Sequence, residues 1–162
     1  MGFQNFSSVH AMLQTTVERC QDRPAFRTIV DDGRATETVS WREFAAEVRR
    51  VAKSLLALGV EADDKVCILS YSCYRWTLVD VAAQSLGSVS VGIYQSLLAK
   101  DCRYIIDHAD AVLVFAQDAG QVEKLRAIRP DIPRVRRVVV FEGHPTDDGW
   151  VTIRVTEVND AP

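Results

Sequence analysis

The spacing of apolar residues changes along the chain, and residues 8–39 show first a helical and then a strand-like pattern. Apolar residues within 8–20 recur at helical spacing, which predicts a short amphipathic helix that ends before Pro24. Two apolar runs at 25–30 and 37–39, joined by Asp31-Asp32-Gly33, are typical of a β-hairpin. The chain is therefore expected to begin with a helix and a small hairpin.

The strongest periodic signal is one apolar stripe along a single long helix. Ser40 and Glu43 form a capping box at its start, because each side chain can satisfy a free backbone N–H of the first turn. Gly59 supplies the left-handed residue that ends it. The stripe consists of Trp41, Phe44, Ala45, Val48, Val51, Ala52, Leu55 and Leu58.

From Lys65 onward, short and nearly continuous apolar runs alternate with helical segments. Such runs indicate strands that are buried on both faces, and their alternation with helices indicates a parallel sheet. Right-handed crossovers then make the sheet doubly wound, so we expect an α/β fold with a mainly parallel sheet flanked by helices. The expected strands are 66–69, 88–93, 111–116 and 135–141, and the expected helices are 74–86, 98–109 and 119–128.

The tail differs from the repeating pattern before it. Residues 144–149 are rich in turn formers, 152–158 alternate as a strand, and the sequence printed ends without a closing helix. We therefore expect residues 1–162 to form an incomplete domain, with 143–162 running into further structure.

Composition narrows the class of protein. The chain is 48% hydrophobic and 25% charged with a net charge of −3, which argues against a nucleic-acid binder; the Arg134, Arg136 and Arg137 cluster is interpreted as a solvated strand edge. No run approaches the ~20 apolar residues that a membrane span needs, and residues 1–6 lack the pattern of a signal peptide. The four cysteines show no metal-binding spacing, so we expect reduced thiols in a cytoplasmic protein.

Ligands of a doubly wound sheet bind at the carboxyl ends of its strands, so any ligand-binding residues are expected in the loops there. The first, 70–73, contains no glycine, which excludes a classical dinucleotide fingerprint, and no glycine opens a phosphate-binding G-x-x-x-x-G-K-[ST] loop. His10, His108 and His144 have no nucleophile at a recognisable spacing. We expect no catalytic residue, and the Asp31-Asp32 and Asp147-Asp148 pairs are interpreted as turns, not metal ligands.

Three aromatic residues gather where the first buried strand leads into its helix. Tyr71, Tyr74 and Trp76 fit two interpretations. They either pack the start of the helix under a loop, or they line one wall of an apolar ligand channel.

Several segments together resemble the adenylate-forming acyl-CoA synthetases. Residues 38–44 (TVSWREF) resemble the family's TY-x-E-L entry, and 56–66 resemble its L-x-x-x-G-V-x-x-G-D-x-V passage, with Asp64 and Lys65 departing from the usual Gly-Asp. Residues 83–94 match A-x-x-x-x-G-A-V-x-V-P-x-Y, and 104–111 resemble Y-I-L-x-x-S-x-A. The Tyr94-Gln95-Ser96 form, with glutamine where many relatives have proline, is most similar to long-chain fatty-acid–CoA ligases.

The resemblance implies an ATP-dependent, AMP-forming ligase as the parent enzyme. A fatty acid and ATP give an acyl-adenylate and pyrophosphate, Mg²⁺ neutralises the phosphate charge, and the CoA thiol then displaces AMP. The family's Ser/Thr/Gly-rich phosphate loop lies just beyond the region matched, so this first lobe of the amino-terminal domain is expected to be inactive alone and to bind no cofactor. On the same resemblance Tyr94, Gln95, Ser72 and Trp76 are expected to shape the acyl or CoA side of the crevice.

A protein of another class is the alternative. A stand-alone, non-catalytic α/β module could act by association, and an uncovered sheet edge would favour a homo-dimer. A flavodoxin-like mononucleotide binder is disfavoured by the glycine-poor strand-end loops. Peripheral contact of the parent enzyme with a membrane stays open.

Overall fold

The computed structural model describes residues 6–30 and 35–142. The helices are α1 (Val9–Cys20), α2 (Trp41–Ala57), α3 (Tyr74–Ser85), α4 (Ala99–His108) and α5 (Ala119–Ala127). The strands are β1 (Pro24–Val30), β2 (Ala35–Ser40), β3 (Lys65–Leu69), β4 (Val89–Ile93), β5 (Leu113–Ala116) and β6 (Arg137–Val140). The expected helices and strands of the described region are thus confirmed, with ends that differ by a few residues.

The capping signals at the long helix act as the sequence predicts. The Ser40 hydroxyl accepts a hydrogen bond from the Glu43 backbone N–H at 3.2 Å, and the Ser40 backbone N–H donates to the Glu43 carboxylate at 2.8 Å. The backbone bond to the Glu43 carboxylate, and a second bond that the Ser40 hydroxyl donates to it at 2.7 Å, lower the pKa of Glu43 because they favour its charged form. Gly59 has φ +78, so the helix ends in the left-handed conformation.

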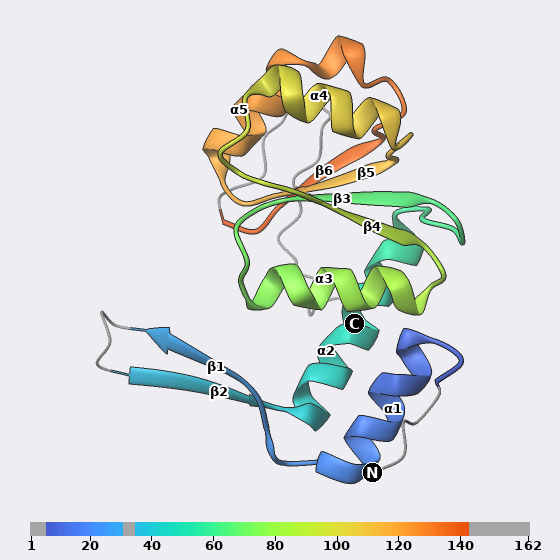
Figure 1. The fold of residues 1–162 in the computed structure, drawn as a ribbon, viewed down its shortest axis with the longest axis vertical. Coiled ribbons are helices and arrows are strands. Elements are labelled where there is room, and N and C mark those ends of the chain that lie inside the picture. Colours follow the sequence, from blue (N-terminus) through green and yellow to red (C-terminus); the bar gives the residue numbers. More distant parts are fainter. Residues whose placement is uncertain (1–5, 31–34, 143–162) are drawn as a thin grey trace.

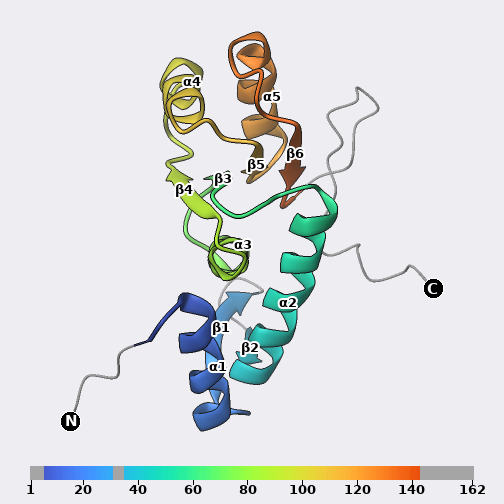
Figure 2. The ribbon, with the colours of Figure 1, turned by 90° about the vertical axis from the view of Figure 1, so that its right-hand side faces the viewer.

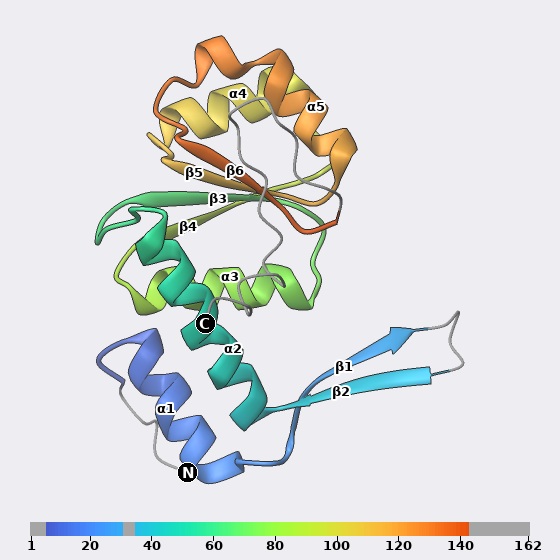
Figure 3. The same cartoon turned by 180° about the vertical axis from the view of Figure 1, so that it is seen from behind.

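The main sheet is four-stranded and entirely parallel, in the order β4-β3-β5-β6. Helices α2 and α3 cover one face, and α4 and α5 cover the other (Figures 1 and 2). This arrangement confirms the doubly wound α/β class. The β1–β2 hairpin is antiparallel and forms a separate small sheet, which lies beyond α3 and next to the start of α2 (Figure 3).

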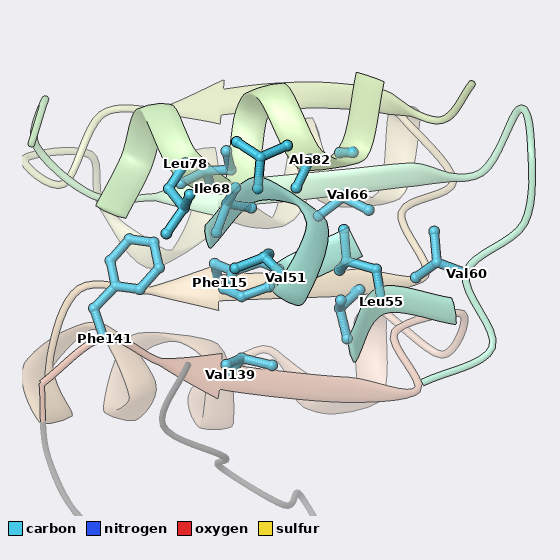
Figure 4. Close-up of a cluster of buried hydrophobic side chains, with 14 of the residues drawn as sticks. Val51, Leu55, Val60, Val66, Ile68, Leu78, Ala82, Phe115, Val139 and Phe141 are labelled. Carbon is cyan, nitrogen blue, oxygen red and sulfur yellow. The ribbon is translucent and has the colours of Figure 1, made fainter. Parts of the chain in front are cut away.

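Two apolar layers hold the sheet between its helices. On the α2–α3 side, Val66 and Ile68 of β3 meet Leu55 and Phe115, all at most 2% exposed (Figure 4). On the α4–α5 side the alternate residues of β3 point into a second cluster that contains Cys102. Burial on both faces explains why β3 reads as a continuous apolar run.

Aromatic rings attach the hairpin to the helices. The Phe26 ring lies 4.8 Å from that of Phe44 and 5.1 Å from that of Tyr74, measured between centroids. The Tyr74 hydroxyl donates to the Glu47 carboxylate at 2.9 Å. Burial is the main cause that raises the pKa of Tyr74, and the hydrogen bond to Glu47 is the second. The packing interpretation of Tyr74 is therefore confirmed.

Some local features lay beyond the sequence pattern. A short 3₁₀ helix at Arg129–Asp131 was not expected, and Pro130 in its first turn favours it. The final strand begins at Arg137 and not at 135, and the Arg136 backbone N–H bonds to Val112. The expected turn and strand in 143–162 and the Asp31-Asp32-Gly33 turn lie outside the described residues.

The basic cluster before β6 is engaged with acidic and backbone groups. Arg134 lies 3.4 Å from the Asp110 carboxylate. Arg136 donates to the Gly59 carbonyl at 2.9 Å and to the Asp64 carboxylate at 3.1 Å. Asp64 also accepts from the Glu61 backbone N–H at 3.0 Å. The loop in which Asp64 departs from the family pattern is therefore held by its own ion pair.

Within 6–30 and 35–142, none of the helices has the length and apolar character to cross a bilayer.

Candidate functional site

The strand order places a switch point between β3 and β5. The chain leaves β3 toward β4 on one side and then crosses to β5 on the other. In open α/β sheets the crevice at the carboxyl ends of such strands is where ligands bind. Ser70 directly follows β3 and Gln117 directly follows β5, so these two residues define the candidate site.

A hydrogen bond closes the switch point. Ser70 and Gln117 are 5% and 3% exposed, and the Ser70 hydroxyl donates to the Gln117 side-chain carbonyl. The same hydroxyl lies 2.8 Å from the Tyr71 backbone carbonyl. The backbone reinforces the link, since the Gln117 N–H donates to Leu69 at 3.0 Å. The crevice is therefore filled by the chain's own polar groups.

The network continues to β6 and returns to α3. The Gln117 amide nitrogen donates to the Glu142 carboxylate at 3.2 Å. Arg75 donates to the Phe141 carbonyl at 2.9 Å, and its guanidinium lies 3.7 Å from Glu142. We call Ser70, Gln117, Glu142 and Arg75 the carboxyl-edge network. It joins three strand ends to one helix and pairs its only anion with its only cation.

This donor set does not fit a triphosphate. A phosphate site needs free backbone N–H groups or cations that point at the anion. Here Arg75 is engaged with Phe141 and Glu142, and the loop after β3 has no glycine to bring the backbone close. In the described part of the chain, no group of three His, Cys, Asp or Glu residues is placed to hold a metal ion.

The four residues singled out from the sequence occupy different environments. Tyr94 follows β4 and is 77% exposed, and Ser72 is exposed in the loop after β3. Trp76 is half-buried in the first turn of α3; a Cβ at Gly92 would lie 3.3 Å from its ring, so the ring packs against β4. No hydrogen bond among the described residues joins any two of the four predicted positions. Whether they contact a ligand stays a prediction.

Gln95 is anchored by a residue that the sequence did not single out. The Lys124 ammonium group on α5 donates to the Gln95 carbonyl at 2.5 Å and to the Leu97 carbonyl at 3.0 Å. The partners are 29 and 27 residues apart, so no local motif could have indicated this link. It fixes the backbone of the loop that carries Tyr94.

The described histidines and the cysteines lie in environments that indicate a structural role. His10 lies 2.7 Å from Gln14 on α1, and His108 stacks on Tyr104 with ring centroids 5.5 Å apart. All four cysteines are free thiols, and burial raises the pKa of Cys67 to about 12. Such a thiol is protonated at neutral pH and is a poor nucleophile. His144 lies outside the described residues.

A small hollow beside Ile106, Asp110 and Arg134 lies away from this edge, and its volume of about 10 Å³ leaves room for a single water molecule at most. It is smaller than the ~300 Å³ at which small-molecule sites usually begin. The carboxyl edge is therefore the better candidate site.

Comparison with curated proteins and solved structures identifies relatives. The model of the family described as AMP-binding enzyme matches residues 13–161. A long-chain-fatty-acid–CoA ligase, FadD15, of Mycobacterium bovis is 32% identical over 105 residues, which are 65% of this chain and 18% of the ligase. A shorter uncharacterized protein of Mycobacterium tuberculosis is 33% identical over 109 residues, covering 67% of this chain and 60% of that protein.

The same fold occurs in a solved ligase. The structure of the anthranilate CoA ligase AuaEII in complex with anthranoyl-AMP superposes on 96% of this chain with a TM-score of 0.81 and 18% identity, using 28% of its own length. This chain thus spans about a fifth of the length of the curated long-chain ligases it matches. On the match to residues 13–161, the chain belongs to the family of AMP-binding, adenylate-forming enzymes.

Proposed function

We propose that this chain is the first lobe of the amino-terminal domain of an ATP-dependent, AMP-forming fatty-acyl-CoA synthetase. The parent enzyme converts a fatty acid and ATP into an acyl-adenylate and pyrophosphate, and then transfers the acyl group to CoA with release of AMP. The family match to residues 13–161 carries this proposal. The names of the curated ligases of Mycobacterium bovis and Mycobacterium tuberculosis support the long-chain fatty acid as substrate.

The lobe contributes scaffold and no reacting group. Its carboxyl-edge network is internally paired, and the described residues supply neither a phosphate cradle nor a Mg²⁺ ligand set. No step through ATP or Mg²⁺ is therefore assigned to them. We infer that the chain alone is inactive and that the residues handling phosphate belong to the rest of the parent enzyme.

The best candidates for ligand contact are Tyr94 and Gln95. Tyr94 presents an exposed ring from a loop whose backbone is bound by Lys124, a combination suited to lining an acyl or CoA channel. Ser72 is exposed and free to contribute a hydroxyl. Trp76 has an indirect role, because its ring packs against Gly92 and supports the end of β4.

The cellular setting is inferred from the same features. We place the parent enzyme in the cytoplasm, since a reducing compartment keeps thiols such as Cys67 and Cys102 unpaired. Fatty acid, ATP and CoA are the small-molecule partners of the proposed reaction. No nucleic-acid partner is proposed for a chain of net charge −3.

A chimeric enzyme tests the proposal. The stretch of the Mycobacterium tuberculosis FadD15 ligase that matches this chain is replaced by the corresponding residues of this chain. Fatty-acid-dependent ATP–pyrophosphate exchange and acyl-CoA formation are measured for the chimera, for FadD15 and for the 162-residue chain alone. We expect activity in the chimera and FadD15, and none in the chain alone.

Each result has one interpretation. Exchange catalysed by the pure 162-residue chain would contradict its incompleteness. A chimera that melts cooperatively near the FadD15 temperature yet catalyses no exchange would contradict the scaffold role. Tyr94→Ala in the active chimera should raise the KM for fatty acid or CoA, whereas the matched exposed-tyrosine control Tyr104→Ala on α4 should leave it unchanged.

A further inference from the structure

The two edges of the parallel sheet differ in their exposure. In β6 the three valines Val138, Val139 and Val140 are at most 4% exposed, although the strand is an edge of the sheet. In β4, by contrast, Val89 is 46% exposed, and Ser90 and Val91 are only partly buried. Among the described residues, the β4 edge, at one side of the sheet in Figure 2, is therefore the more exposed of the two.

Within the part of the chain that the structure describes, β4 pairs only with β3, so alternate residues of β4 have backbone groups without a strand partner. The Val89 N–H donates to the Asp64 carbonyl at 2.8 Å, and the strand pairs in parallel register with β3 from Val89 to Ile93. In a regular strand alternate residues turn their N–H and C=O to opposite sides. Val89, Val91 and Ile93 therefore bond to β3, and Ser90 and Gly92 direct their backbone groups away from the sheet.

The charge on the two edges decides what can pair with them. Natural proteins protect exposed edges with charged residues, and β4 (Val-Ser-Val-Gly-Ile) has none. Asp80 on α3 lies beside this strand, where its carboxylate accepts hydrogen bonds from the Ser90 hydroxyl and, at 2.8 Å, from the Gln84 amide. The β6 edge begins with Arg137 next to Arg136, so two copies meeting there would repel each other.

From this contrast we propose that this chain, on its own, forms a twofold-symmetric dimer by antiparallel pairing of β4 with β4 of a second copy. An isologous contact places each surface against itself, which only an uncharged edge permits without like-charge repulsion. The pairing extends the four-stranded sheet into one of eight strands. This proposal is independent of the proposed synthetase function.

The alternation of the backbone fixes a register. With the twofold axis at Val91, Ser90 of one copy lies opposite Gly92 of the other, and all four outward backbone groups of each pair find partners. Val91 then meets its symmetry mate as an apolar cross-strand pair. Gly92 brings no side chain to the contact, and Tyr94 and Leu98, 77% and 62% exposed, add apolar surface at each end.

The oligomeric state of the 162-residue chain gives the first test. Sedimentation over a concentration series should show a reversible monomer–dimer equilibrium. Val89→Lys places a charge at the contact and should weaken dimerisation by about tenfold or more. Val89→Thr keeps the β-branched shape without the charge and should dimerise normally, as should Arg137→Ser on the other edge. Circular dichroism checks that each variant is folded.

Amide hydrogen exchange gives a second test that needs no variant. Raising the concentration of the unmodified chain should slow exchange at the Ser90 and Gly92 amides. The Val91 amide, which bonds to β3, should be protected at every concentration and serves as the internal control. A chain that stays monomeric throughout, or a dimer that Val89→Lys leaves intact and that exchanges Ser90 and Gly92 at the monomer rate, would overturn the proposal. The monomeric result would leave the edge for another occupant, such as a strand of a longer parent polypeptide.

Discussion

Ser70→Ala is expected to destabilise the chain more than Gln117→Leu, although both changes remove the same buried hydrogen bond. The reason lies in what each change leaves behind. Without Gln117, the Ser70 hydroxyl still has the Tyr71 carbonyl 2.8 Å away as an acceptor. Without Ser70, the Gln117 side-chain carbonyl keeps no hydrogen-bond donor among the described residues, and Gln117 is only 3% exposed.

The two costs can be estimated from these partners. A buried polar group left without a partner costs about 1–3 kcal/mol, so we expect Ser70→Ala to lower the free energy of unfolding by about 2 kcal/mol. Loss of one net hydrogen bond costs about 1 kcal/mol, which is the expectation for Gln117→Leu because the Glu142 side chain, 55% exposed, returns to water. At this chain length 1 kcal/mol corresponds to about 2–4 °C in melting temperature.

Urea unfolding followed by circular dichroism measures both variants and the double variant. The double variant removes donor and acceptor together, so its cost should fall short of the sum of the single costs by about 1 kcal/mol. The reasoning would be refuted if Ser70→Ala cost less than Gln117→Leu, or if the costs added within about 0.3 kcal/mol. Unchanged m-values would confirm that the variants unfold from the same native state.

Three further changes test other parts of the structure by the same unfolding assay. Gly59→Ala should destabilise by about 1 kcal/mol, because φ is +78 there and an L-residue is strained; an unchanged melting curve would contradict this. Gln121→Met should be neutral or stabilising, because no described residue donates a hydrogen bond to the buried Gln121 side-chain oxygen. Gln84→Met, which breaks a 2.8 Å bond to Asp80, should destabilise the chain. The free energy of unfolding should fall above pH ~9, by up to about 1.4 kcal/mol per pH unit. The Cys67 thiol of the unfolded chain ionises in this range, whereas the thiol of the folded chain, with its pKa raised to about 12, stays protonated. Cys67→Ala should make this fall less steep.

The alternation of apolar runs and helices was enough to predict the sheet, because burial on both faces forces each strand to be apolar throughout. The capping box at Ser40 and Glu43 and the left-handed Gly59 could also be predicted, because the groups that interact there lie within a few residues of each other. The order of the strands in the sheet could not be predicted, because an apolar run such as 111–116 does not indicate which neighbour its strand pairs with.

The carboxyl-edge network shows why the site resisted prediction. Ser70 and Gln117 are 47 residues apart, and Gln117 and Glu142 are 25 apart, so their meeting depends on the strand order itself. The loop at 70–73 contains no glycine, so the sequence predicted that no phosphate loop follows β3, and this absence stays a prediction. The sequence could not show that Ser70, Gln117 and Glu142 hydrogen-bond to one another.

The anchoring of the loop after β4 bears on where a ligand would touch this lobe. At the switch point, Ser70 and Gln117 satisfy each other, and a ligand would have to break a buried bond to enter. After β4, Lys124 binds two backbone carbonyls and leaves the Tyr94 ring 77% exposed. A fixed backbone lowers the entropy that is lost when an exposed side chain is immobilised by a ligand. We therefore propose the loop after β4, and not the central crevice, as the part of this chain that would contact substrate in the proposed parent synthetase. Lys124→Met should then weaken that contact by loosening the loop, with Tyr94 itself unchanged.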